Sequence, residues 1–166
     1  MKIEGKLAPY AARLIAVAGG YVPSDRPVTT EVIQGLAVEN EEVGSCVANL
    51  DTESREKVFS YAVYKFMLAN HAASLAVKAR KYLDAESQIA VGDLERIVNE
   101  NDDVRTIVND LNERDRKKVF RFVVSKWLQS QEVISEVQEA ISDALTRENV
   151  KSDTDQTSDP NQDTKV

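Results

Sequence analysis

Side chains that commonly perform catalysis are scarce in this sequence, so the search for chemistry starts from two single residues. His71 is the only histidine, and no Glu stands three residues before it, which excludes the Glu-x-x-His ligand pair of a di-iron helical bundle. Cys46 is the only cysteine and stands between apolar residues at helical spacing. We expect Cys46 to be a small core side chain rather than a nucleophile, and His71 to be exposed and non-catalytic. The sequence therefore predicts a protein that is not an enzyme and has no catalytic residues.

Acidic, asparagine-containing segments at 39–42 and 100–103 are the best candidates for a cation site. Asn99, Asn101 and Asp103 have the alternating spacing of the first ligands in a calcium loop. The sixth and twelfth positions of that loop are Val104 and Asp110, where such loops carry Gly and Glu. A glycine-rich phosphate-binding loop is also absent from the sequence. We therefore predict neither a metal site nor a cofactor site.

Residues 114–126, called here the basic segment, carry the strongest signal for nucleic-acid binding. Cations alternate there with aromatic residues, as on surfaces that bind single strands. The cations are Arg114, Arg116, Lys117, Lys118, Arg121 and Lys126. They stand at the expected start of a helix, whose positive end disfavours them, and they are spread around that helix. Binding of nucleic acid through the basic segment is the alternative hypothesis for function.

The composition indicates the class of fold. The chain has 166 residues and a net charge of −7, with 30% charged and 6% aromatic residues and only 6 Gly and 4 Pro. This balance disfavours a β-sandwich or barrel and is typical of a helical protein. Apolar runs are all shorter than the roughly 18 residues of a membrane span. A single cysteine fits a reducing compartment. We therefore expect no membrane segment and a cytoplasmic location.

An internal match organises the chain. Residues 39–66 align without a gap with residues 100–127, an offset of 61, and 11 of the 28 pairs are identical. A match of this length predicts two copies of one supersecondary unit, over about 30–82 and 91–147. Asp51 and Asn112 hold equivalent positions, where each is well placed as the N-cap of a long helix.

Hydrophobic periodicity predicts three helices in each copy and one helix before them. The expected helices lie at 7–18, then at 30–38, 43–50 and 52–82 in the first copy, and at 93–98, 104–111 and 113–146 in the second. Residues 151–166 are acidic and almost without apolar side chains, which predicts a disordered tail. The predicted fold is all-α: a single helical domain over 1–150, built as a bundle of two tandem three-helix repeats, with an N-terminal helix and a disordered acidic tail.

Two apolar surfaces are candidates for protein contact. Tyr64 and Met67 interrupt the polar stripe of the first long helix, which is otherwise apolar on most sides and therefore belongs in the centre of a bundle. Ile134 and Ile141 lie in an apolar stripe near the end of the second long helix. Either the N-terminal helix or the same stripe of a second copy is expected to cover that stripe, the latter giving a homodimer.

The leading functional hypothesis combines these signals. Catalytic constellations are absent, a helical unit is duplicated, and hydrophobic residues occupy otherwise polar faces. We therefore expect a non-enzymatic protein-interaction or assembly subunit of a larger complex. Its protein partner is not identified by any motif in the sequence.

Overall fold

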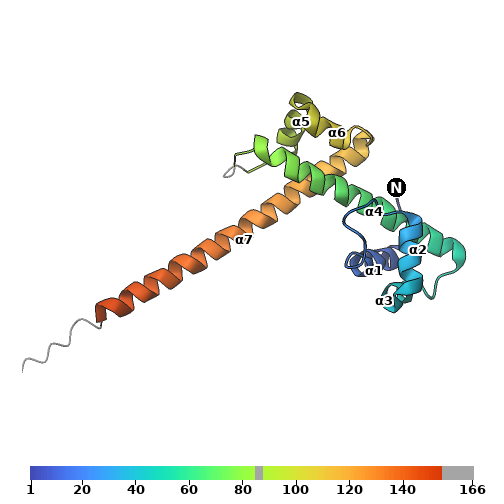
Figure 1. Ribbon diagram of the computed structural model, residues 1–166, viewed down its shortest axis with the longest axis horizontal. Coiled ribbons are helices and arrows are strands. Elements are labelled where there is room, and N and C mark those ends of the chain that lie inside the picture. Colours follow the sequence, from blue (N-terminus) through green and yellow to red (C-terminus); the bar gives the residue numbers. More distant parts are fainter. Residues whose placement is uncertain (85–87, 155–166) are drawn as a thin grey trace, which may run out of the picture. The chain divides into compact units, whose positions relative to one another are not determined.

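The computed structural model describes the backbone of residues 1–84 and 88–154, and the side chains of those ranges except 131–135, 138 and 148–154. Every element within these ranges is a helix, which confirms the all-α prediction (Figure 1). The helices are α1 (Ala8–Ala18), α2 (Thr30–Glu39), α3 (Glu41–Ser45), α4 (Thr52–Ala79), η1 (Arg80–Tyr82), α5 (Val91–Glu100), α6 (Asp102–Val108) and α7 (Glu113–Thr154). The chain divides into two compact units, Met1–Val124 and Ser125–Val166, called here the first unit and the C-terminal unit.

Capping side chains fix where the helices begin. Thr29, Asn40 and Asp51 each accept a hydrogen bond from the backbone N–H three residues further on, at 3.4, 3.1 and 2.8 Å, and so start α2, α3 and α4. Asn112 accepts the same bond at 2.9 Å at the start of α7. Each bond satisfies one of the N–H groups that a helix start leaves without a partner. The predicted N-caps Asp51 and Asn112 are therefore confirmed.

The helix starts recur at the spacing of the sequence match. Helices α2, α3 and α4 begin at Thr30, Glu41 and Thr52, and α5, α6 and α7 begin at Val91, Asp102 and Glu113. Each start in the second group lies 61 residues after its counterpart, since 91 − 30, 102 − 41 and 113 − 52 all give 61. The same order of two short helices and one long helix thus occurs twice.

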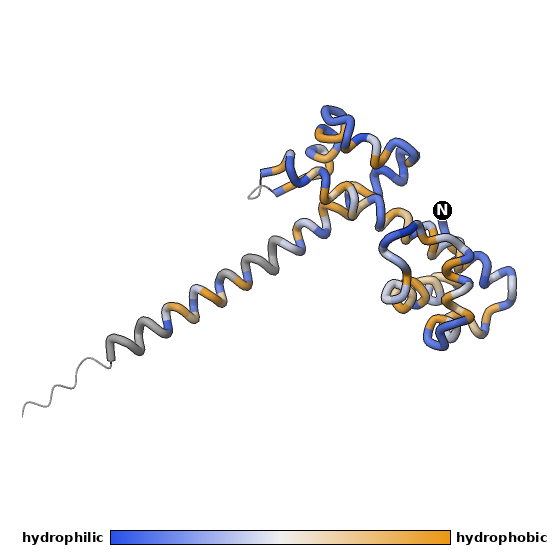
Figure 2. Tube along the Cα trace, viewed as in Figure 1, coloured by the Kyte–Doolittle hydropathy of each residue, from blue (hydrophilic) through white to orange (hydrophobic). Residues whose placement is uncertain are grey.

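Helix α4 is the central element of the first unit. Its N-terminal half packs against α1 and α2, and its C-terminal half packs against α6, as Figure 1 shows. Buried side chains lie along its whole length: Val58, Phe59, Ala62, Leu68, Ala72, Leu75 and Ala79. The prediction that this nearly all-apolar helix occupies the centre of a bundle is confirmed for the first unit. Buried residues of α1–α4 form one core cluster, and Figure 2 shows apolar segments in each of these helices.

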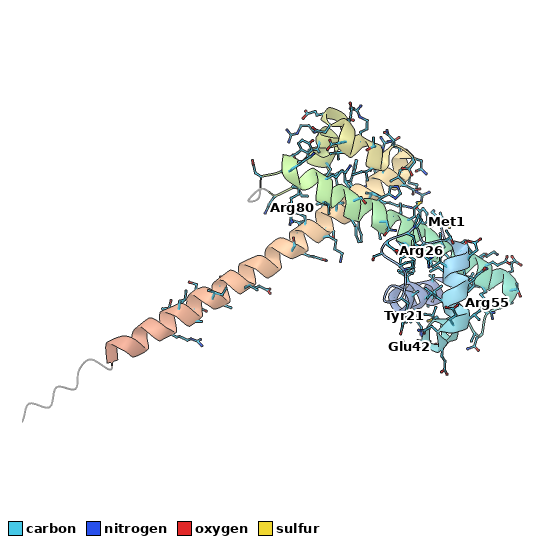
Figure 3. All side chains as sticks on the ribbon, viewed as in Figure 1. Met1, Tyr21, Arg26, Glu42, Arg55 and Arg80 are labelled. Carbon is cyan, nitrogen blue, oxygen red and sulfur yellow. The ribbon has the colours of Figure 1, made fainter. Side chains whose placement is uncertain are left out.

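Helix α1 uses its apolar face inside the first unit. Leu7, Ala11, Leu14 and Ala18 are buried in one core cluster with residues of α2, α3 and α4. This face of α1 thus has a partner within the first unit, and what covers the C-terminal apolar stripe stays a prediction. Just after α1, the Tyr21 hydroxyl donates to a Glu42 carboxylate oxygen of α3 at 2.9 Å, and both residues are labelled in Figure 3.

The ends of the two long helices differ from each other. Helix α4 ends at Ala79 and η1 continues to Tyr82, the end that the sequence predicted. Helix α7 extends to Thr154, so residues 151–154 of the predicted disordered tail are helical. The remainder of that predicted tail, residues 155–166, lies outside the described residues.

Candidate functional site

Tyr64 is the centre of a polar cluster between α4 and the first turn of α7. Its hydroxyl donates to Asp115 Oδ1, and Lys118 Nζ donates to the same hydroxyl at 2.6 Å. Asn112 Nδ2 donates to the other carboxylate oxygen of Asp115 at 3.0 Å. Asp115 is only 8% exposed, and Tyr64 is half-buried. Sequence reasoning had instead placed Tyr64 on the polar stripe of this helix, at the surface. The structure therefore gives Tyr64 contacts within the first unit, and its role in binding a partner stays a prediction.

The charges of this cluster stabilise one another. The hydrogen bond from Tyr64, aided by those from Asn112 and Lys118, lowers the pKa of Asp115. Burial, followed by the bond to Asp115, raises the pKa of Tyr64. The bond to the Tyr64 hydroxyl raises the pKa of Lys118, whose ammonium also lies 5.0 Å from the centre of the Tyr64 ring. At neutral pH the cluster is thus an ion pair bridged by a neutral phenol, an arrangement suited to holding two helices together.

Met67 is half-buried and lines an open pocket of about 460 Å³ between α4 and residues 24–28. His71 lines the same pocket, and its side chain is only 19% exposed. Its Nδ1 lies 2.9 Å from the Met67 carbonyl oxygen, and its Nε2 lies 3.3 Å from the Asp110 carboxylate. The histidine that was expected to be exposed is therefore half-buried, because its ring lies beside the loop 24–28 and within reach of Asp110 in the turn after α6. Within the described ranges, no three His, Cys, Asp or Glu side chains are grouped so as to hold a metal ion.

The basic segment is partly neutralised by the chain itself. Lys117 pairs with Glu113 at 2.7 Å, Lys118 belongs to the Tyr64 cluster, and Arg116 donates to the Val108 carbonyl oxygen at 3.3 Å. Arg114, Arg121 and Lys126 are exposed. Of the aromatic side chains in and next to the basic segment, Phe120 and Trp127 are buried, at 2% and 9% exposed, whereas Phe122 is 46% exposed. Binding of nucleic acid through the basic segment therefore stays a prediction.

The C-terminal unit carries an exposed apolar face on α7. Val137, Ile141 and Leu145 follow one another at intervals of four residues and are 51%, 55% and 58% exposed. Residues four apart share one face of a helix. Orange and blue segments alternate along this part of the helix in Figure 2, and the exposed acidic residues are Glu136, Glu139 and Asp143. Ile141 is thus exposed within this chain, while the side chain of Ile134 lies outside the described residues, and the role of both in protein contact stays a prediction.

Two grooves occupy corresponding places beside the two pairs of short helices. The first groove, about 270 Å³, is lined by Gln34, Ala37, Val38, Gly44, Val47, Ala48, Arg55 and Phe59. The second groove, about 200 Å³, is lined by Glu95, Val98, Asn99, Glu113, Arg116, Lys117 and Phe120. Five positions are shared at the offset of 61: 34 and 95, 37 and 98, 38 and 99, 55 and 116, and 59 and 120. The first groove is mainly apolar, whereas the second contains several charged side chains.

An arginine lines each groove at a matching position of the sequence. Arg55 donates to the Leu50 carbonyl oxygen at 3.2 Å, and Arg116 donates to the carbonyl oxygen of Val108 at 3.3 Å, which is not the counterpart of Leu50 in the internal match. The Nε atoms of both arginines are buried, and neither has a hydrogen-bond partner among the described residues. Figure 3 labels Arg55 at the start of α4. Sequence reasoning gave Arg55 no role, although its identity with Arg116 in the internal match was a signal for a shared position.

None of the helices within the described ranges is both long enough and apolar enough to cross a lipid bilayer. Comparison of the chain with protein-family models, with curated proteins and with solved structures gave no match.

Proposed function

We propose that this chain is a non-enzymatic assembly subunit that associates through the apolar face of α7, defined by Val137, Ile141 and Leu145. The supporting observation is that all three side chains are more than half exposed. Fully burying a Val, Ile or Leu side chain is worth about 1.5–3 kcal/mol, so a face with three of them gains stability from a second helix. A protein partner that supplies an apolar helix face meets that requirement.

The distribution of charge on α7 favours the same face of a second copy as the partner. Glu136, Glu139 and Asp143 are exposed on the same stretch of helix. Helical geometry places positions 139 and 143 on the side opposite to 137, 141 and 145. Two copies can therefore bring their apolar faces together while these carboxylates remain in solvent. A contact of this kind uses the same surface on both chains and closes as a two-fold dimer.

We also propose that α2–α4 and α5–α7 are copies of one three-helix unit. Their equal spacing of helix starts, their arginines bonded to backbone carbonyls and their two grooves at shared positions support this interpretation. Duplication of a helical unit is common in proteins whose function is to present surfaces to partners. It agrees with an assembly role and adds no catalytic group.

Dimerisation is tested on the full chain by sedimentation velocity and light scattering over a range of concentrations. The wild type should change from monomer to dimer as its concentration rises to about 100 µM. Val137→Glu with Ile141→Glu should remain monomeric because it places two carboxylates on the apolar face. Gln129→Glu with Thr146→Glu is the matched control, since these exposed positions receive the same added charge away from that face.

The proposal makes opposite predictions for the two double variants. The control should dimerise like the wild type, and circular dichroism should show that both variants keep their helix content. A wild type that stays monomeric up to about 100 µM would refute the dimer. Loss of dimer in both double variants would show that added charge, and not this apolar face, determines association.

A further inference from the structure

Arg105 of α6 closes the corner between α5 and α6. Its Nε donates to the Val98 carbonyl oxygen at 3.2 Å, and its NH2 group donates to the carbonyl oxygen of Asn99. Its NH1 group pairs with Asp102 Oδ1 at 2.7 Å. These carbonyls stand at the C-terminal end of α5, where a helix leaves acceptors without intrahelical partners. A single guanidinium thus satisfies two carbonyl groups and one carboxylate.

The corner between α2 and α3 has the matching acceptors but no arginine. The positions 61 residues before Val98, Asn99 and Asp102 are Ala37, Val38 and Glu41, and position 105 corresponds to Gly44. Among the described residues, no N–H or side-chain donor is bonded to the carbonyl oxygens of Ala37 and Val38. Glu41 is exposed and has no ion-pair partner in the part of the chain that the structure describes. The acceptors of a guanidinium site are therefore present without a donor.

The chain cannot supply that donor from position 44. A Cβ atom placed on Gly44 would lie 2.5 Å from the Ala37 carbonyl oxygen, which is closer than atoms tolerate. The end of α2 thus packs directly against the backbone of Gly44, which leaves no room for a side chain at this position. A guanidinium that reaches these acceptors has to come from elsewhere.

We propose that the α2–α3 corner is a binding site for an arginine side chain of a partner polypeptide. The first groove lies beside the acceptors and is lined by the apolar residues Val38, Val47 and Phe59. Val38 is 86% exposed, so an apolar residue next to the partner's arginine finds a surface to cover. The planar fork of arginine matches paired oxygen acceptors, whereas the ammonium of lysine does not.

The charges around the corner are compatible with a basic partner. Glu39, Glu41 and Glu42 lie within four residues of one another and are all exposed. Arg55 is a cation that also lines the first groove. Its counterpart Arg116 lines the second groove, and there Arg105 still occupies the neighbouring α5–α6 corner. An arginine at this position is thus compatible with a second arginine in the corner. This site is separate from α7, so it does not depend on dimerisation.

The test uses the full 15N-labelled chain and the dipeptide acetyl-arginyl-leucine amide as the probe, followed by NMR. The peptide should produce saturable shifts at the backbone amides of Val38, Glu41 and Gly44. Its matched control contains citrulline, which keeps the shape of arginine but carries no charge. Because each charge-assisted hydrogen bond contributes about a factor of ten or more, the citrulline peptide should bind at least tenfold more weakly.

Two variants separate the proposed contacts from general attraction to an acidic surface. Glu41→Gln should weaken binding of the arginine peptide about tenfold, whereas Glu56→Gln, an exposed carboxylate on α4, should leave it unchanged. Arg105→Ala should vacate the α5–α6 corner and add a second set of saturable shifts near Asn99 and Asp102. Spectra of the variants without peptide show whether each remains folded, and the Glu41→Gln measurement does not depend on the stability of Arg105→Ala.

The proposal is wrong if the arginine peptide causes no saturable shift at this corner at concentrations up to about 10 mM. It is equally wrong if the citrulline peptide binds within a factor of two of the arginine peptide, or if Glu41→Gln binds as tightly as the wild type. If Arg105→Ala folds but gains no second set of saturable shifts, the partner's arginine does not bind as Arg105 does, and the proposal is contradicted.

Discussion

Removing the Tyr64 hydroxyl should weaken the first unit measurably. In Tyr64→Phe, Asp115 Oδ1 loses the hydrogen bond from the phenol and keeps only the longer contact with Lys118 Nζ at 3.4 Å. Hydrogen bonds to charged groups contribute about 1.5–3 kcal/mol, and Asp115 is 8% exposed, so water replaces the lost partner poorly. We therefore expect Tyr64→Phe to lower the free energy of unfolding by about 1.5–3 kcal/mol.

A double-mutant cycle with Asp115→Asn measures the coupling directly. The two groups contact each other, so their effects should not add, and a coupling energy of about 1–2 kcal/mol is expected. Urea unfolding followed by far-UV circular dichroism at about pH 7 gives the four free energies. Effects that add to within about 0.5 kcal/mol would refute the view that Tyr64 stabilises the fold through Asp115.

The pH dependence of the same variants provides a second measurement. The pKa of Asp115 is lowered from its ordinary value of 3.8, mainly by the bond from Tyr64. A lowered carboxyl pKa stabilises the folded state above the ordinary value, and that contribution is lost as the pH falls through the lower folded-state pKa. The difference in unfolding free energy between wild type and Asp115→Asn should be constant above about pH 5 and shrink below about pH 4. A difference that persists unchanged down to about pH 2 would contradict the assignment.

Three further measurements examine the fold and the basic segment. Gly44→Ala should lower the free energy of unfolding by about 1–3 kcal/mol because the added Cβ atom meets the Ala37 carbonyl oxygen. Gly35→Ala should raise the free energy of unfolding by about 0.5–1 kcal/mol because its Cβ atom meets open space inside α2. Leu14→Ala should lower the same free energy by about 2–5 kcal/mol, since Leu14 is fully buried, and urea unfolding measures all three variants. Gel retardation of a short single-stranded RNA at low salt should detect no complex at micromolar protein, and a complex that weakens steeply with added salt would restore the basic segment as a binding site.

The sequence by itself determined the order of the helices and the starts of the long ones, although α3 ends at Ser45 and α6 at Val108, where periodicity predicted ends at 50 and 111. Helix formation depends on hydrogen bonds between residues four apart and on caps at the ends, and both are encoded locally. Asp51 and Asn112 therefore located the starts of both long helices, and Tyr82 located the end of η1. Apolar periodicity also predicted that Cys46, 2% exposed, and the central face of α4 are buried. The spacing of 61 residues between helix starts was readable from the internal match.

Contacts between helices were decided only by the tertiary structure. Periodicity shows that Tyr64 and His71 share a polar stripe, but it does not show which helix meets that stripe. Their partners Asp115 and Asp110 lie 51 and 39 residues away in the chain. A separation of that length is crossed by the packing of several helices, whose crossing angles depend on side-chain shape rather than on local pattern. Tyr64 therefore resembled an exposed surface residue in the sequence and is half-buried in the fold.

The difference between the two short-helix corners has the same origin. In the alignment, Gly44 opposite Arg105 is one mismatch among many. Its meaning depends on the distance between α3 and the end of α2, where a Cβ atom on Gly44 would meet the Ala37 carbonyl. It also depends on which carbonyls the Arg105 guanidinium reaches. The sequence determines which side chains are available at each position. The approach of one helix to another determines which backbone carbonyl oxygens those side chains can reach.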